Sequence, residues 1–151
     1  MSRTMAGIIL TMQNKEAEAR KEYELALAAD PQAAVAANNL SWVLADKGEQ
    51  LDTALQLAQT AKSHMPESGD VSDTLGWIYY KKGLTSLAVS ELRQAVARSP
   101  ASAVVHYHLG LAELKNGGRA DARKALEQAL KLDPTFSNAD DAKRVLSTLA
   151  G

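Results

Sequence analysis

The chain has 151 residues, of which 46% are hydrophobic and 23% are charged, and its formal net charge is −1. The hydrophobic fraction suffices for a buried core and excludes a disordered chain, while the mixed charges form no basic stripe of the kind that binds nucleic acid. No apolar run approaches the roughly 20 residues that span a bilayer, so we expect neither membrane insertion nor a nucleic-acid partner. The sequence has no cysteine, which excludes disulfides and thiol chemistry but leaves the compartment open.

Four prolines divide the chain into blocks of nearly equal length. Pro66, Pro100 and Pro134 are spaced by 34 residues, and Pro31 lies 35 residues before Pro66. One alanine stands twelve residues ahead of each proline and another stands five ahead. These alanines are Ala19, Ala26, Ala54, Ala61, Ala88, Ala95, Ala122 and Ala129. Self-similarity at such a period predicts a stack of small repeated units rather than one globular core.

Within each block the apolar residues recur at helical spacing, so each block is predicted to fold as helix, turn, helix. The first block begins almost in mid-helix, near Ala6, and turns at Asn14. The helices predicted after that turn span residues 16–29, 34–46, 52–65, 72–80, 85–98, 105–115, 120–132 and 138–149.

Glycine marks the end of the first helix in three blocks, at Lys47-Gly48, Lys82-Gly83 and Asn116-Gly117. A cation in the last turn followed by a left-handed glycine is typical of a helix end. Thr85 or Ser86 is predicted to cap the following helix. The proline of each block ends the second helix, because proline disfavours helical conformation in the residue before it. The turn at residues 48–51 contains the one extra residue of the second block.

The two ends of the chain differ in how their apolar side chains are covered. The last predicted helix has one apolar and one charged face, as the end of an open stack requires. The first block has no cover for Met5, Ile8 and Met12. We therefore expect the chain to be the C-terminal piece of a longer array, or its first block to be covered by a second copy. A complete chain would be cytoplasmic, and a fragment of an exported protein would be periplasmic.

The spacing of individual residues resembles the tetratricopeptide repeat. The third block matches its pattern at Leu75, Gly76, Tyr79, Ala88, Leu92, Ala95 and Pro100. The fourth block differs in having Glu113 where the third has Tyr79. The resemblance implies an all-α solenoid of stacked helix-turn-helix repeats, wound into a right-handed superhelix with a C-terminal capping helix. The whole chain, residues 1–151, would be a single domain. Its repeats would span about 1–33, 34–68, 69–102 and 103–136, with the capping helix at 137–150.

Three segments have a narrower resemblance. Residues 38–42, 73–77 and 106–110 look like the C-terminal repeats of long bacterial proteins of this family. Some of those proteins belong to exopolysaccharide or protein-export systems.

The family resemblance also implies a function and a surface. In this family the first helix of each pair lines a concave groove, so we expect a non-catalytic scaffold that binds a peptide or helical segment of another protein. The groove positions are Asn38, Asn39, Trp42, Asp73, Thr74, Trp77, Tyr80, Lys81, Tyr107, His108 and Leu111, with Lys115 beside them. Tryptophan and tyrosine are favoured where binding energy concentrates. Tyr107 is expected on the open part of this surface.

Two alternatives to groove binding remain open. Ile8, Trp42, Trp77 and Leu111 share one position in the four blocks, and their side chains could pack as core between helices instead of meeting a partner. The chain could also be a self-associating structural spacer of a longer bacterial array, for secretion or exopolysaccharide assembly, that pairs through its first repeat.

One known binding mode of the family finds no matching residues. The carboxylate clamp grips an acidic C-terminus with lysine, asparagine and arginine from three successive first helices. The corresponding positions here are Asn38, Trp42, Thr74, Val104 and His108. With no lysine or arginine among them, charge-assisted capture of a terminal carboxylate is not expected.

No set of residues points to catalysis or to a metal. His106 and His108 are two apart on a helix, so they face different sides and cannot share one ion. Asp70 with Asp73, and Asp140-Asp141, have no accompanying nucleophile or phosphate loop, and acidic residues are favoured at helix starts. We expect no enzyme activity, no cofactor and no metal, and the charge balance disfavours RNA binding by helical repeats.

Overall fold

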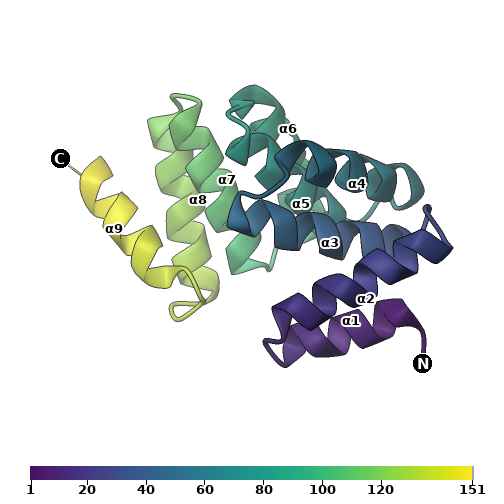
Figure 1. Ribbon diagram of the computed structural model, residues 1–151. Coiled ribbons are helices and arrows are strands. Elements are labelled where there is room, and N and C mark those ends of the chain that lie inside the picture. The colour runs from purple at the N-terminus through teal and green to yellow at the C-terminus, as the bar shows by residue number, and fades with distance from the viewer. Residues whose placement is uncertain (151) are drawn as a thin grey trace. The chain divides into compact units, whose positions relative to one another are not determined.

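The computed structural model describes residues 1–150, and within them the chain forms nine helices and no strand (Figure 1). Successive helices pair through short turns. The helices are α1 (Arg3–Met12), α2 (Glu16–Ala29), α3 (Ala34–Lys47), α4 (Leu51–His64), α5 (Gly69–Lys81), α6 (Thr85–Arg98), α7 (Ala103–Lys115), α8 (Arg119–Leu132) and α9 (Ala139–Leu149). The predicted helix, turn, helix pattern of each block is confirmed, with bounds shifted by a few residues.

The chain divides into two compact units, Met1–Pro66 and Glu67–Gly151. In the first unit α1 packs on α2 and α3 on α4, and α2 joins the two pairs by contacting α3. In the second unit α5 packs on α6 and α7 on α8, α6 contacts α7, and α9 closes the unit against α8. Inside each unit, like pairs stack on one another as the repeat predicts.

Serine side chains cap the N-termini of α1, α5 and α7, each of which is the first helix of its pair. The hydroxyls of Ser2, Ser68 and Ser102 each accept a hydrogen bond from the backbone N–H three residues later. This satisfies one of the donors that a helix start leaves unpaired. The predicted side-chain cap at Thr85 or Ser86 is wrong, because α6 begins at Thr85 and its N-cap residue, Leu84, makes no side-chain hydrogen bond.

The turns within the pairs use left-handed backbone where the sequence predicts it. Gly48, Gly83 and Gly117 have φ values of 68°, 77° and 88°, which glycine adopts without the steric cost that other residues pay. The extra residue of the second block is accommodated by Gln50, whose φ is also positive, at 45°.

The helices of a pair approach closely at a glycine. A Cβ atom added at Gly76 would lie 2.6 Å from Cγ of Leu92, and one added at Gly110 would lie 2.7 Å from Cγ of Leu126. The sequence pairs Gly76 with Ala88, but the atom nearest to the glycine belongs to Leu92, one helical turn further along α6. Ala88 itself is fully buried.

The last helix is covered on one side and charged on the other, as predicted. Ala142, Val145 and Leu149 are buried in one cluster with Leu126 of α8 and Phe136 of the preceding loop. Phe136 therefore belongs to the hydrophobic core of the last pair.

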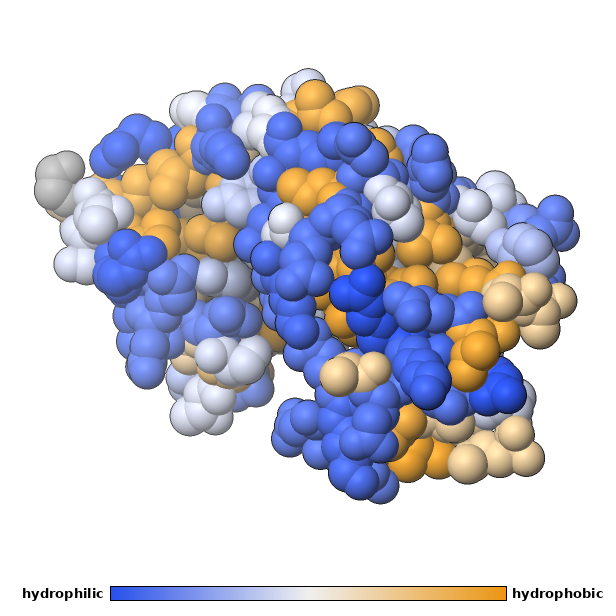
Figure 2. Space-filling view, in the orientation of Figure 1, coloured by the Kyte–Doolittle hydropathy of each residue, from blue (hydrophilic) through white to orange (hydrophobic). Residues whose placement is uncertain are grey.

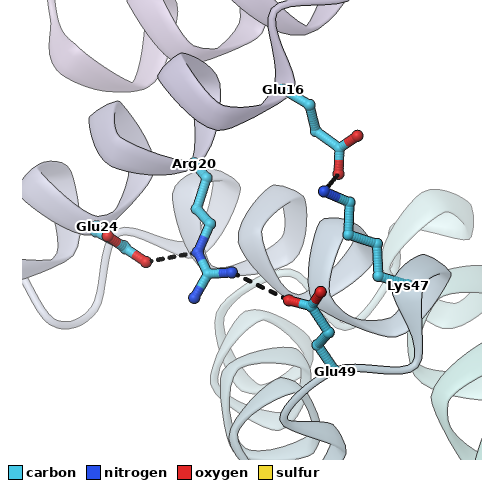
Figure 3. A network of polar contacts seen from close by, with 5 residues as sticks. All are labelled: Glu16, Arg20, Glu24, Lys47 and Glu49. Carbon is cyan, nitrogen blue, oxygen red and sulfur yellow. Dashed lines mark hydrogen bonds and ion pairs between the residues drawn. The ribbon is translucent and has the colours of Figure 1, made fainter.

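In the first unit, ion pairs join the pairs of helices at the surface (Figure 3). Arg20 of α2 contacts Glu24 at 2.8 Å and Glu49, just after α3, at 3.3 Å. Lys47 of α3 contacts Glu16 of α2 at 3.0 Å. Because all five side chains are at least partly exposed, each pair adds little to stability, on the order of 0–1 kcal/mol.

We expect Ala88→Leu to lower the free energy of unfolding by ~1–3 kcal/mol, because the larger side chain overpacks the junction of α5 and α6. Ala97→Leu on the same helix is the matched control, since Ala97 is exposed and should tolerate the change. Urea unfolding measures both. Equal stability of Ala88→Leu and the wild type would contradict the close packing described here.

Candidate partner-binding surface

The first unit contains three of the predicted groove residues. Asn38, Asn39 and Trp42 lie on α3 and are half-buried. Asn39 and Trp42 line a small cavity of about 140 Å³, together with Ile8 of α1 and Tyr23 of α2. Ile8 and Trp42, which share a repeat position, thus face a common space within this unit.

In the second unit, α5 and α7 are joined by a stack of three rings. The ring of Trp77 stacks with those of Tyr80 and His108, with centroid distances of 4.8 and 4.3 Å. Nδ1–H of His108 donates a hydrogen bond of 2.8 Å to Oδ1 of Asp73. His108 and Asp73 are both largely buried, so this bond satisfies two polar groups that would otherwise be costly to bury.

The predicted residues of this unit separate into a buried layer and an accessible layer. The buried layer comprises Asp73, Thr74, Trp77, Tyr107 and His108. Tyr80 and Leu111 are half-buried and Lys81 is exposed. A partner can therefore reach the second group directly, while the first group supports it from beneath.

Two lysines lie over two of the stacked rings, those of Trp77 and Tyr80. Nζ of Lys81 is 5.1 Å from the Trp77 ring centroid, and Nζ of Lys115 is 4.6 Å from that of Tyr80. Lys115 also donates to the backbone carbonyl of Tyr80 at 3.4 Å. Among the residues that the structure describes, neither lysine has an ion-pair partner. Such cation–π contacts are attractive and leave ammonium hydrogens available to a further acceptor.

The expectation that Tyr107 lies on an open part of the surface is wrong. Its side chain is only 5% exposed. Its hydroxyl donates a 2.5 Å hydrogen bond to Oδ2 of Asp141 on α9, and its ring packs edge-on against Phe136. Nε and Nη2 of Arg144 donate to the other oxygen, Oδ1, at 3.1 and 2.6 Å. Tyr107 is thus a structural link between α7 and α9.

These contacts shift three acid–base equilibria. The hydrogen bonds from Tyr107 and Arg144 lower the pKa of Asp141 below its ordinary value. Burial, followed by the bond to Asp141, raises the pKa of Tyr107. Burial, followed by the charge of Asp141, also raises the pKa of Tyr80. The charge of Asp141 on α9 therefore acts on the half-buried ring of Tyr80.

Sequence reasoning missed Asp141 and Phe136 as neighbours of this surface. From the sequence, Asp140-Asp141 is predicted to be a solvated helix start, because acidic residues are common there. The sequence does contain one sign of this contact. Asp141 lies 34 residues after Tyr107, so it occupies on α9 the position that Tyr107 occupies on α7.

The remaining candidates behave as ordinary structural residues. Nε2–H of His106 donates to the carbonyl of Pro100 at 2.9 Å, on a different side of α7 from His108. Across residues 1–150, no three histidine, cysteine, aspartate or glutamate side chains come together as a metal site. None of the helices in this range combines the length and apolar character that crossing a bilayer requires.

Comparison with known sequences gives a consistent result. A sequence model of the tetratricopeptide repeat matches residues 74–135 and 107–150. The TPR repeat-containing protein PA4667 of Pseudomonas aeruginosa is 32% identical over 104 residues, which are 69% of this chain and 18% of that protein. The chain thus spans less than a fifth of the length of this curated relative.

Solved structures confirm the all-α repeat solenoid. The crystal structure of TTC0263, a thermophilic TPR protein of Thermus thermophilus, is similar with a TM-score of 0.78 and 25% identity, over 97% of this chain and 79% of that one. MamA from Desulfovibrio magneticus RS-1 gives a TM-score of 0.71 at 19% identity, over 98% of this chain and 91% of that one. At this lower identity the likeness concerns the fold alone.

We expect Tyr107→Phe to raise the pKa of Asp141 toward its ordinary value. At neutral pH the free energy of unfolding should fall by about 1 kcal/mol, a low value for a bond to a carboxylate because Asp141 is partly exposed. Since the folded protein lowers this pKa, the stabilisation is complete above the unfolded-state pKa and is lost as the pH falls through the folded-state value. The difference from wild type should therefore shrink below about pH 4.

Urea unfolding at neutral and strongly acidic pH, with a ¹³C NMR titration of Asp141, measures both effects. Tyr79→Phe is the matched control, since the Tyr79 hydroxyl makes no hydrogen bond within the described residues. A Tyr107→Phe penalty that is independent of pH would show that the hydroxyl stabilises the fold without Asp141.

Proposed function

This chain belongs to the tetratricopeptide-repeat family, and we propose that it binds a peptide or helical segment of another protein on its first-helix face. The family and fold are those of protein–protein interaction scaffolds, which are typically non-catalytic. The specific surface proposed is the one formed in the second unit by Tyr80, Lys81, Leu111 and Lys115, backed by Trp77. In the first unit, Asn38, Asn39 and Trp42 are proposed as the corresponding contacts on α3.

This proposal is based on the ring of Tyr80, which is half-buried and is held in place by neighbouring side chains. Trp77 stacks beneath it, and the Asp73–His108 hydrogen bond holds the stack from α7. An aromatic side chain that is already ordered loses little conformational entropy on binding, so more of its contact energy appears as affinity. Tyrosine and tryptophan are also the residues in which interface energy is concentrated.

The same surface indicates what a partner segment should offer. Tyr80 and Leu111 provide apolar contact area, and the ammonium groups of Lys81 and Lys115 can meet carboxylates or backbone carbonyls. A segment with an apolar anchor and an adjacent acceptor fits both features. Because the lysines lie at an exposed surface, their contribution should weaken with salt, while that of the rings should persist.

A photocrosslinking experiment tests the surface before the partner is known. Benzoylphenylalanine placed at Lys81 should crosslink a protein segment in the cells that express this chain. The same replacement at Lys131, an exposed lysine of α8, is the matched control and should not capture that segment. Crosslinking of the same segment from both positions would contradict binding on the first-helix face.

The captured segment, made as a synthetic peptide, then allows a quantitative test. We expect Tyr80→Ala to weaken its binding by ~1–2 kcal/mol, or about 5- to 30-fold, as for a moderate interface hot spot. Leu87→Ala, at an exposed residue of α6, should bind as the wild type does. Isothermal titration calorimetry measures both, and circular dichroism checks that helicity is unchanged. Unaltered affinity in Tyr80→Ala would sink the proposal.

A second candidate function is self-association through α1. Met5, Ile9 and Met12 are 49%, 37% and 79% exposed, and Figure 2 shows apolar residues reaching the surface over the N-terminal helices. Exposed apolar side chains gathered on one element often mark an interaction site. This observation favours a structural role in which copies of the chain pair through their first repeat.

We expect light scattering of the wild type to give a mass above 16.2 kDa that rises with concentration. Met12→Glu should return the chain to the monomer mass, because a charge within an apolar contact is costly to bury. Leu84→Glu, at an exposed leucine outside α1, is the control and should leave the association unchanged. A wild type that is monomeric at all concentrations would exclude this second function.

A further inference from the structure

The second unit has a cavity on the side away from the ring stack. It lies over α7 between α6 and α8 and measures about 420 Å³, within the roughly 300–1,000 Å³ range of small-molecule pockets. Its apolar walls are Val96, Leu109 and Ala125. Its polar lining consists of Arg93, His106, Glu113, Asp121, Lys124 and Gln128.

The cavity is located where the fourth block departs from the repeat pattern. The equivalent position holds Leu10, Leu44 and Tyr79 in the first three blocks and Glu113 in the fourth. Tyr79 packs against the buried cluster of α6. Glutamate brings a carboxylate to this position in place of an apolar or aromatic side chain, and that carboxylate lines the cavity beside α7.

Glu113 is paired with an arginine at this buried position. Its side chain is only 5% exposed. Nε and Nη2 of Arg93 both donate to the same oxygen, Oε1, at 3.0 and 2.7 Å. Arg93 makes no hydrogen bond to the second oxygen, Oε2, so this oxygen keeps capacity to accept one. Asp121, at 3.9 Å from Arg93, adds a second, exposed carboxylate at the rim.

The same arrangement occurs on the other side of the unit, where it is complete. Arg144 donates through Nε and Nη2 to one oxygen of Asp141, and the Tyr107 hydroxyl donates to the other at 2.5 Å. Arg93 and Glu113 form the same kind of pair, but no phenol hydroxyl of the described chain donates to Oε2 of Glu113.

We propose that this cavity binds the ring of a phenol, either a tyrosine side chain of a protein partner or a free phenolic molecule. The ring packs between Val96, Leu109 and Ala125, and its hydroxyl donates to Oε2 of Glu113. Arg93 and Lys124 at the rim offer cations to the ring face, as Lys115 does for Tyr80. The ligand thus supplies an aromatic ring, which the third block has in Tyr79 and the fourth block does not have at Glu113. This site is separate from the first-helix face.

Titration of the ¹⁵N-labelled full chain, followed by NMR, tests the proposal. The probes are N-acetyl-tyrosinamide and its matched analogue without the hydroxyl, N-acetyl-phenylalaninamide. We expect saturable shifts of the amides of Leu109, Asp121 and Ala125 with the tyrosine probe. Binding of the phenylalanine probe should be about fivefold weaker, corresponding to one hydrogen bond. No saturable shift at these amides, or equal affinity for both probes, would overturn the proposal.

Variants that fill the cavity provide the decisive comparison. Glu113→Tyr places a ring of the chain's own in the space, and Ala125→Leu fills it from α8 while keeping the Arg93–Glu113 pair. Both should abolish binding of the tyrosine probe. Tyr80→Ala, on the other face, should leave it unchanged, so failure here is distinguishable from failure of the first-helix surface. Persistent binding in both filled variants would refute the site.

Two further probes identify the source of the phenol. p-Cresol represents a free molecule, and the capped tripeptide Gly-Tyr-Gly represents a side chain in a protein. Tighter binding of the tripeptide than of p-cresol assigns the cavity to a tyrosine of a partner. The reverse order assigns it to a small phenolic ligand.

Discussion

The close approach of the two helices in a pair is the constraint on which the second unit depends. The glycines at Gly76 and Gly110 lie directly under leucine side chains of the partner helix, at distances that leave no room for a Cβ atom. Because interiors are packed as densely as organic crystals, a larger residue there would separate the helices rather than fit between them. With each pair fixed in this way, α5 and α7 come near enough for Asp73 to reach His108 and for three rings to stack.

The stack explains why the predicted surface residues have two different roles. Trp77 and His108 have the residue types expected at a binding site, yet they are almost entirely buried. In the proposed surface they hold Tyr80 and the neighbouring lysines in a fixed arrangement. A preorganised surface of this kind loses less entropy when a partner binds than a surface of mobile side chains would. Of the predicted groove residues in this unit, one layer is packed in the core and the layer above it is accessible.

The two faces of the second unit use the same polar chemistry to different ends. On one face Asp141, paired with Arg144, accepts a hydrogen bond from the hydroxyl of Tyr107, and this bond links α9 to α7. On the other face the Arg93–Glu113 pair lines a cavity. A buried carboxylate is tolerated when it is paired and hydrogen-bonded, and both carboxylates are paired with an arginine through one oxygen. The residue that departs from the repeat pattern, Glu113, is the one that brings a carboxylate to this cavity.

The sequence alone determined the repeat, its period, the helix pairs and the family, because these follow from local spacing of prolines, glycines and alanines that any stack of such units must share. It also singled out Glu113 as an exception. It could not determine which aromatic side chains are covered, because burial depends on residues about 34 positions away: Asp141 meets Tyr107, and His108 meets Asp73. Only tertiary packing brings the equivalent faces of successive helices together, and that packing decided which rings form the support and which meet solvent.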